Sequence, residues 1–240
     1  TTISNGTLKL KANDVVSTVL PATNAVAFAS TGGFANGDLE FVGQAGVNNT
    51  QSLGTVTYAT AGAHTITVTP GAGGTASLTF ANITTGGAGT VNIVGADFTN
   101  NRVTFSQVNA AAGTDGILTR SVYWNGADFA YRQGGVLRAP NHGVDAGTAT
   151  TAVGPLTAGS TNQITGSFST GTISVANVKM SGSQTLTATG TLTLSAGGLL
   201  ATVSDDKTLR LWNLPEGTQR MVIRPPMGTE AEGELYAVAL

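Results

Sequence analysis

Short runs in which apolar and polar residues alternate recur along most of the chain. Such alternation places apolar side chains on one face of a β-strand and polar side chains on the other. The runs start about 9–14 residues apart, close to the strand-and-turn spacing of all-β folds. They are Leu39–Val42, Val56–Tyr58, Thr65–Val68, Ser77–Phe80, Val91–Val94, Arg102–Phe105, Ile164–Phe168, Ile173–Val175, Leu186–Ala188 and Leu192–Leu194. The pattern predicts a ladder of short strands.

Glycine-rich turns separate these predicted strands. Pro70–Gly74, Thr85–Gly89 and Gly113–Gly116 supply residues that tolerate the positive φ angles of tight corners. No long stretch follows the period of a helix, and threonine and glycine are poor helix formers. The strands also resemble one another, which favours stacked rungs that contact mainly their neighbours. We therefore predict an all-β parallel β-helix, that is, a solenoid, with a β-sandwich as the alternative.

Composition narrows the class of protein. Hydrophobic residues make up 40% of the 240 residues and charged residues only 10%, unlike the composition of disordered chains. The net charge is −2 without a basic run, so we expect no nucleic-acid partner. No apolar run reaches the roughly 18 residues of a membrane-spanning helix, so we expect no membrane span. Cysteine is absent, which excludes disulfides and cysteine–metal sites.

The density of charge rises sharply near residue 200. Residues 1–200 hold 14 charged side chains, whereas residues 201–240 hold 10 in a fifth of that length. Threonine, asparagine and glycine dominate before this break, and tryptophan, proline, arginine and glutamate become frequent after it. Two styles of sequence meet there.

Three phrases before the break carry a family resemblance. They are GGFANGDLEFVGQAG, TQSLGTVTYATAGAHTITVTPGAGGTASLTFANIT and GTDGILTRSVYWNGADFAYRQGGVLRA. Together with Gly116–Leu118, Gly126–Ala130 and Thr191–Gly198, they resemble the autotransporter-associated β-strand repeat proteins of environmental bacteria over roughly residues 30–200. The resemblance implies a right-handed parallel β-helix in a passenger region exported to the cell surface. It also implies adhesion or a structural stalk, with surface glycans or proteins of host or neighbouring cells as partners.

The end of the chain resembles a second family. Leu199–Leu214 is similar to two strands of a WD-repeat propeller blade that are joined by an acidic turn and close on a tryptophan. Ser204, Asp206 and Trp212 match positions that lock the blade by hydrogen bonds in that family, whereas the upstream Gly-His pair is missing. Asn213 stands where the family usually has aspartate. The match amounts to about one blade, and a propeller needs about four to eight.

These resemblances divide the chain into a β-solenoid over residues 1–198 and a partial propeller-blade-like antiparallel β segment over residues 199–240. Gly197–Thr202 fits both families equally well. A genuine fusion and an accidental joining of two unrelated sequences at this shared string both remain open. The chain begins at Thr1 without a signal peptide and stops within an expected strand at Leu240, so we expect an excerpt from a longer protein.

Titratable side chains form no catalytic motif. His64 lies in an alternating run and is expected at a solvent-facing strand position, whereas His142 lies near Asp145 in an expected polar loop. Asp38 and Glu40 are spaced to share a strand face, and no basic partner is evident beside them. We expect no catalytic residue, no cofactor and no metal site.

Aromatic residues gather in one stretch of the sequence: Tyr123, Trp124, Phe129 and Tyr131. One hypothesis is a packed loop or a rung insertion. The other is a platform on which a sugar ring stacks, since aromatic faces suit such contacts. These four residues are the candidate ligand contacts.

The sequence therefore predicts a non-catalytic structural or adhesive surface segment of an autotransporter-like bacterial protein, located at the cell surface or outside the cell. The alternative is a protein-interaction scaffold in which the solenoid is a spacer for a propeller. A polysaccharide-active β-helix enzyme ranks third, because its site would need clustered carboxylates and the acids of residues 1–200 are isolated.

Overall fold

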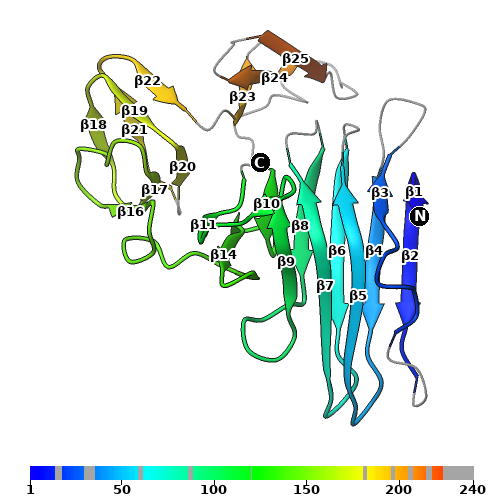
Figure 1. Cartoon of the computed structure of the whole chain (residues 1–240). Coiled ribbons are helices and arrows are strands. Elements are labelled where there is room, and N and C mark those ends of the chain that lie inside the picture. The colour runs from blue at the N-terminus through cyan, green and yellow to red at the C-terminus, as the bar shows by residue number, and fades with distance from the viewer. Residues whose placement is uncertain are drawn as a thin grey trace. The chain divides into compact units, whose positions relative to one another are not determined.

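All regular structure in the described part of the chain is β-structure (Figure 1). The computed structural model describes residues 1–13, 18–29, 36–58, 62–85, 89–119, 121–180, 183–195, 198–204, 208–214 and 218–223, the last three ranges by their backbone pairing. The predicted all-β class is thereby confirmed. By its internal contacts the chain divides into two compact units, Thr1–Asn141 and His142–Leu240.

The first unit is built on two sheets between which the chain passes repeatedly. The first sheet contains, in spatial order, β1 (Thr2–Ile3), β3 (Val26–Phe28), β5 (Asn48–Thr57), β7 (Thr75–Thr84) and β9 (Val103–Val108). The second contains β2 (Asn5–Lys11), β4 (Asn36–Val42), β6 (Ala63–Thr69), β8 (Thr90–Val94) and β12 (Val122–Trp124). These strands pair in parallel within each sheet (Figure 1). The result is a β-solenoid of about 4 turns, which confirms the predicted solenoid.

Side-chain alternation fixes which face of each sheet is inside. In β4 and β6, buried and half-buried positions alternate along the strand. Because the strands pair in register, buried residues of successive strands lie next to one another, and Leu39, Ile66 and Ile93 form one buried column. Each fully buried aliphatic side chain of this kind contributes about 1.5–3 kcal/mol relative to exposure. The core is therefore a set of columns that run from rung to rung.

His64 contradicts the expectation of a solvent-facing position. Its side chain is only 1% exposed, its ring stacks on Phe28 with centroids 4.6 Å apart, and its Nδ1 lies 3.1 Å from the Gly37 carbonyl oxygen. The reason is the period of the strand: His64 has the same parity as Ile66, which points into the core. His64 is therefore a core residue of the first unit.

Close approach of the backbone explains two of the glycines. At Gly54, inside β5, a Cβ atom would lie 2.7 Å from the Thr23 carbonyl oxygen, so a larger residue would force the chains apart. At Gly95, φ is +73° and a Cβ would lie 2.3 Å from the Val68 oxygen. Gly95 thus lets the chain leave β8 directly above the preceding rung.

Beyond β9 the pairing of the first sheet changes from parallel to antiparallel. The added strands are β10 (Ala111–Ala112), β11 (Gly116–Ile117), β14 (Tyr131–Gln133) and β15 (Val136–Arg138), while β13 (Asp128–Phe129) pairs with β12 in the second sheet. Arg132 lies within β14 and is buried. Its guanidinium donates to the carbonyl oxygens of Phe105 (3.0 Å), Ser106 (3.3 Å) and Gly113. It thereby satisfies backbone acceptors at the end of the rung stack.

The second unit contains a smaller parallel stack. One sheet consists of β16 (Thr148–Thr151), β17 (Thr161–Ile164) and β20 (Asn177–Met180); β18 (Phe168–Thr170) pairs with β21 (Leu186–Ala188), and β19 (Ile173–Val175) pairs with β22 (Leu192–Leu194). Leu156, Ile164 and Val175 form its buried centre. All four of these pairings among β16–β22 join strands in parallel, as in the first unit.

The last described strands are antiparallel to one another. They are β23 (Gly198–Ser204), β24 (Thr208–Leu214) and β25 (Thr218–Ile223), with a register irregularity between Leu211 and Trp212. An antiparallel segment was predicted from residue 199 onward. The boundary between residues 198 and 199 as a domain limit stays a prediction.

Candidate ligand-binding surface

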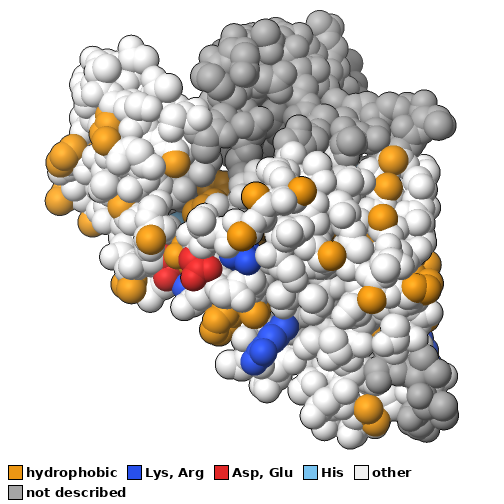
Figure 2. Space-filling model, in the orientation of Figure 1, with side chains coloured by type: hydrophobic (Ala, Val, Ile, Leu, Met, Phe, Trp, Pro, Cys, Tyr) orange, Lys and Arg blue, Asp and Glu red, His pale blue; other side chains and the backbone are white. Residues whose placement is uncertain are grey.

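The outer faces of the first unit are lined mainly by uncharged polar side chains. In the first sheet, Ser52, Thr79 and Thr104 lie side by side in register on β5, β7 and β9. In the second sheet, Thr65 on β6 lies between Asp38 on β4 and Asn92 on β8. Figure 2 shows one face of the molecule, where charged groups occupy few places. The outer faces of the first unit are therefore largely neutral, and charged groups on them are few.

The acids Asp38 and Glu40 do share the outer face of β4, as predicted. However, Glu40 has a basic partner from the adjacent strand, since its Oε2 lies 3.0 Å from Nζ of Lys9. The Asp38 Oδ1 accepts a hydrogen bond from the Thr65 backbone N–H at 2.9 Å. Lys9 is 55% exposed, so this ion pair contributes little, about 0–1 kcal/mol. Both acids have structural partners on the face of the second sheet.

The four predicted aromatic residues do not form one cluster. Tyr123 and Phe129 pair across β12 and β13 on the outer face of the second sheet, with ring centroids 6.0 Å apart and planes 25° apart. Trp124 instead packs against the hydrophobic core. Tyr131 belongs to β14 in the first sheet, where Arg138 lies over its ring. The packed-insertion hypothesis therefore describes Trp124 and the buried Tyr131, whereas Tyr123 and Phe129 lie on the outer face.

Besides the Tyr123–Phe129 pair, a second group of side chains surrounds Arg138; we call it the Arg138 cluster. Its guanidinium carbon lies 4.5 Å from the centroid of the Tyr131 ring and 5.9 Å from that of Phe98. Phe98 is one of the exposed large hydrophobic residues of the described chain, at 39%. Cation–π contacts of this kind contribute about 0.5–1 kcal/mol at exposed sites. They fix the orientation of a charged group on an otherwise neutral face.

A hydrogen-bonded loop positions Phe98. Burial acts to raise the pKa of the Asp97 carboxyl, but hydrogen bonds from the backbone N–H groups of Asn100, Asn101 and Thr99, and from the Thr99 hydroxyl, outweigh it and lower the pKa to about 2. Arg102 closes the same loop, because its Nε donates to the Thr99 carbonyl oxygen at 2.9 Å. These hydrogen bonds hold the backbone of the loop that carries Phe98 and Arg102.

The Asp97 loop predicts a pH dependence of stability. Because the pKa in the folded state is about 2 and the ordinary value is 3.8, the stabilisation is present above pH 3.8 and is lost as the pH falls towards 2. We expect Asp97→Asn to lower the free energy of unfolding at pH 5 by about 1–2 kcal/mol and to approach the wild type near pH 2. Urea denaturation of both proteins between pH 2 and 5 measures this. A constant difference across that range would show that the carboxylate charge plays no part.

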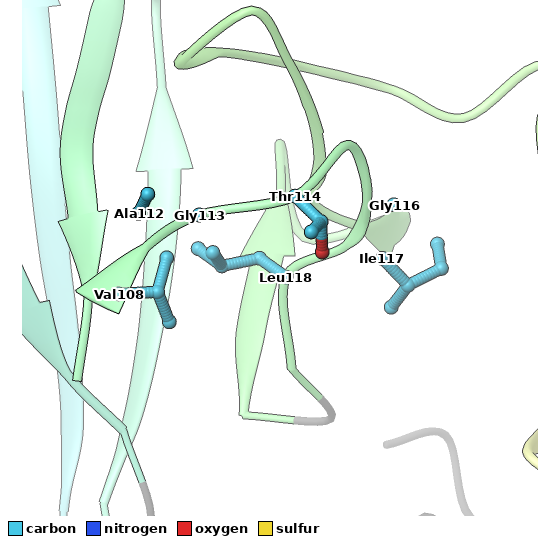
Figure 3. Close-up of a pocket in the computed structure, with 7 residues that line it drawn as sticks. All are labelled: Val108, Ala112, Gly113, Thr114, Gly116, Ile117 and Leu118. Atoms are coloured by element: carbon cyan, nitrogen blue, oxygen red, sulfur yellow. The ribbon is translucent and has the colours of Figure 1, made fainter.

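A shallow pocket of about 250 Å³ lies beside the antiparallel end of the first unit (Figure 3). Val108, Ala112, Ile117 and Leu118 supply its apolar lining, and Leu118 extends towards Val108. Its lining residues carry no titratable group. The pocket therefore offers no acid–base pair.

The remaining predicted positions lie in the second unit. His142 and Asp145 occupy the loop before β16, where the Asp145 carbonyl oxygen accepts hydrogen bonds from the backbone N–H and the hydroxyl of Thr148. Ser204 lies at the end of β23, opposite Thr208, and Trp212 lies in β24, opposite Leu200. Asp206 lies outside the described residues.

Comparison with known proteins adds no identification. No family model, curated protein or solved structure matches the chain. In the described part of the chain, no helix is long and apolar enough to cross a membrane. The surface itself is therefore the basis for a functional proposal.

Sequence reasoning missed two members of the Arg138 cluster, Phe98 and Arg138. Phe98 and Arg138 are separated by the whole of β9 to β15, and antiparallel pairing of β15 with β9 brings them together. The short alternating run Arg102–Phe105 was recognised only as a strand. No local signal in the sequence marks the cluster.

Proposed function

We propose that this chain is a non-catalytic, adhesive surface segment that holds glycans of neighbouring surfaces against the outer faces of a solenoid. One observation carries the proposal: the rings of Tyr123 and Phe129 stack on the outer face of the second sheet, with their centroids 6.0 Å apart. Flat aromatic rings beside rows of hydroxyl and amide groups suit the apolar faces and hydroxyl edges of sugars. The resemblance to autotransporter passenger proteins supports a location on the bacterial surface.

Adhesion under flow tests this proposal. Microspheres that carry the full chain are passed over plates coated with mucin, with pectin or with albumin. We expect retention on at least one glycan coat and none above the level of bare microspheres on albumin. Retention equal to that of bare microspheres on every coat would contradict the proposal.

A protein-interaction scaffold is the second candidate. The observation that favours it is the antiparallel pairing of β23, β24 and β25, which a propeller blade requires and which differs from the parallel rungs. In that case the end of the chain recruits a partner and the solenoid is a spacer.

Deletion of residues 199–240 separates the two candidates. We expect the shortened chain to keep its adhesion under flow, and its melting temperature by far-UV circular dichroism to stay within about 2 °C of that of the full chain, because the rungs of a solenoid depend mainly on their neighbours. Loss of adhesion with an unchanged melting temperature would favour the scaffold. A large fall in the melting temperature would show that these residues complete the fold.

A further inference from the structure

A row of side chains crosses the outer face of the second sheet from strand to strand. Parallel register places Thr65 of β6 between Asp38 of β4 and Asn92 of β8. Tyr123 of β12 lies beside Asn92 in the same register, and antiparallel pairing places Phe129 of β13 beside Tyr123. Neighbouring strands are about 4.8 Å apart, so the row extends over about 19 Å. We call these residues the Tyr123 row.

The sheet positions the Tyr123 row before any ligand binds. Every side chain of the row is half-buried, so its neighbours already restrict it while part of it faces solvent. The residues that follow the row in β6 and β8, Ile66 and Ile93, are fully buried and anchor these strands on the core. Side chains that are already restricted lose less conformational entropy when they bind a ligand. The row is therefore a preorganised surface.

The polar members of the row offer both donors and acceptors. Asn92 Oδ1 accepts a hydrogen bond from the Gly126 backbone N–H at 2.7 Å, which fixes the amide and leaves its Nδ2 as a donor towards solvent. Asp38 is held by one oxygen in the same way, since its Oδ1 accepts from the Thr65 N–H at 2.9 Å and its second oxygen remains an acceptor. The Thr65 hydroxyl lies between them and can do both. Sugar hydroxyl groups, which donate and accept, suit such a series.

The other end of the row is aromatic. The rings of Tyr123 and Phe129 lie with their centroids 6.0 Å apart and their planes 25° apart. A pair of rings of this kind offers an apolar surface on which the C–H face of a sugar can pack. The row thus combines an apolar end with a polar continuation, and a single sugar chain has both kinds of surface.

The charges around the row favour an uncharged ligand. On the outer faces of β2 and β4, Lys9 and Lys11 balance Asp38 and Glu40, and Lys9 Nζ already lies 3.0 Å from Glu40 Oε2. The sequences of β6, β8 and β12 contain no lysine and no arginine. A polyanion would therefore find no cation on these three strands and would meet the carboxylate of Asp38.

We propose that the Tyr123 row binds an uncharged, extended polysaccharide that lies across the strands. One sugar ring packs on Tyr123 and Phe129, and the following rings form hydrogen bonds with Asn92, Thr65 and Asp38. The spacing of the strands is close to the length of one pyranose residue in an extended β-linked chain, so successive strands meet successive sugars. This inference rests on the proposed adhesive function and names its ligand class and binding residues.

Binding of soluble oligosaccharides to the full chain tests the row. The probes are cellohexaose, mannohexaose, xylohexaose and the acidic hexagalacturonate, measured by isothermal titration calorimetry at low and at high salt. We expect at least one uncharged hexasaccharide to bind with an affinity that salt leaves unchanged, because no charge pair is formed. Absence of binding by all three, or tighter binding of hexagalacturonate than of any of them, would overturn the inference.

Variants of the aromatic end locate the site. Tyr123→Ala removes one ring of the pair, and we expect it to weaken binding about tenfold. Tyr123→Phe keeps the ring and should bind within about twofold of the wild type. Phe98→Ala is the matched control, because Phe98 is an exposed aromatic residue outside the row, and it should bind like the wild type. All three variants should keep the wild-type circular dichroism spectrum.

Variants of the polar members test the path of the ligand. Asn92→Asp keeps the oxygen that accepts from Gly126 and removes the Nδ2 donor, so we expect binding to weaken about threefold to tenfold. Thr65→Val keeps the shape of the side chain without its hydroxyl and should weaken binding about threefold. Its control is Thr104→Val on β9 of the first sheet, which should leave binding unchanged.

Two results would overturn the inference even if the wild type binds. Equal losses in Tyr123→Ala and Phe98→Ala would place the ligand elsewhere, and wild-type binding by both Asn92→Asp and Thr65→Val would contradict a path across the strands. The proposed function is judged separately. Adhesion of microspheres under flow without binding of the uncharged hexasaccharides leaves adhesion standing and removes the row as the site. Binding at the row without adhesion under flow leaves the site and removes the adhesive function.

Discussion

Replacing Phe80 with alanine is expected to lower the free energy of unfolding of the first unit by about 3–5 kcal/mol. Phe80 is fully buried in β7, in register between Leu53 of β5 and Phe105 of β9. Its ring stacks on Phe105 with centroids 5.1 Å apart. Ladder hydrogen bonds hold the rungs on both sides at a fixed spacing, so the surrounding backbone cannot move in to fill the cavity. Urea denaturation followed by far-UV circular dichroism measures the loss.

Thr79→Ala is the matched control, because Thr79 precedes Phe80 in β7 and lies on the outer face. We expect it to change the free energy of unfolding by no more than about 0.5 kcal/mol. A similar loss in both variants would mean that β7 is sensitive to any substitution. A negligible loss in Phe80→Ala would mean that the columns of the solenoid can collapse around a cavity.

Local alternation predicted the strands, and the similarity of the strands to one another favoured parallel rungs. The predicted runs Leu39–Val42 and Thr65–Val68 lie inside β4 (Asn36–Val42) and β6 (Ala63–Thr69). The strands start earlier than the runs because pairing with neighbouring rungs, rather than alternation, decides where they begin. His64 shows that the same parity rule, applied strictly, also identifies a buried polar residue, and the error arose from treating histidine as a surface residue.

The candidate surface residues were predicted less well from the sequence than the strands were. Tyr123 and Tyr131 are close in sequence, yet they lie in different sheets because the chain passes from β12 and β13 to β14 between them. Proximity in sequence therefore predicted one cluster where two exist. Phe98 and Arg138 meet only through the pairing of β9 with β15, which depends on long-range register. The change from parallel to antiparallel pairing after β9 leaves no mark in the pattern of apolar residues.

Arg132→Met is expected to lower the free energy of unfolding by about 2–4 kcal/mol. Methionine fills much of the same volume but donates no hydrogen bond, so the carbonyl oxygens of Phe105, Ser106 and Gly113 would lose their buried partner. The carboxylate of Asp115, 3.7 Å from the Arg132 Nη1, would also lose its counter-charge. Its side chain is 51% exposed, so water replaces that partner and this part of the loss is small.

Two controls separate the contributions. Asp115→Asn removes the counter-charge and keeps an oxygen that can accept from the Gly134 N–H, so we expect a loss below about 1 kcal/mol. Arg132→Lys keeps the positive charge without the planar fork, and it should lie between Arg132→Met and the wild type because a single ammonium cannot reach three carbonyl groups in fixed directions. Amide hydrogen exchange locates the effect: faster exchange in β9 and β15, with unchanged exchange in β4 and β6, is expected if the guanidinium holds the end of the stack. Uniformly faster exchange across all four strands would contradict a local role, because the loss would then be a global fall in stability.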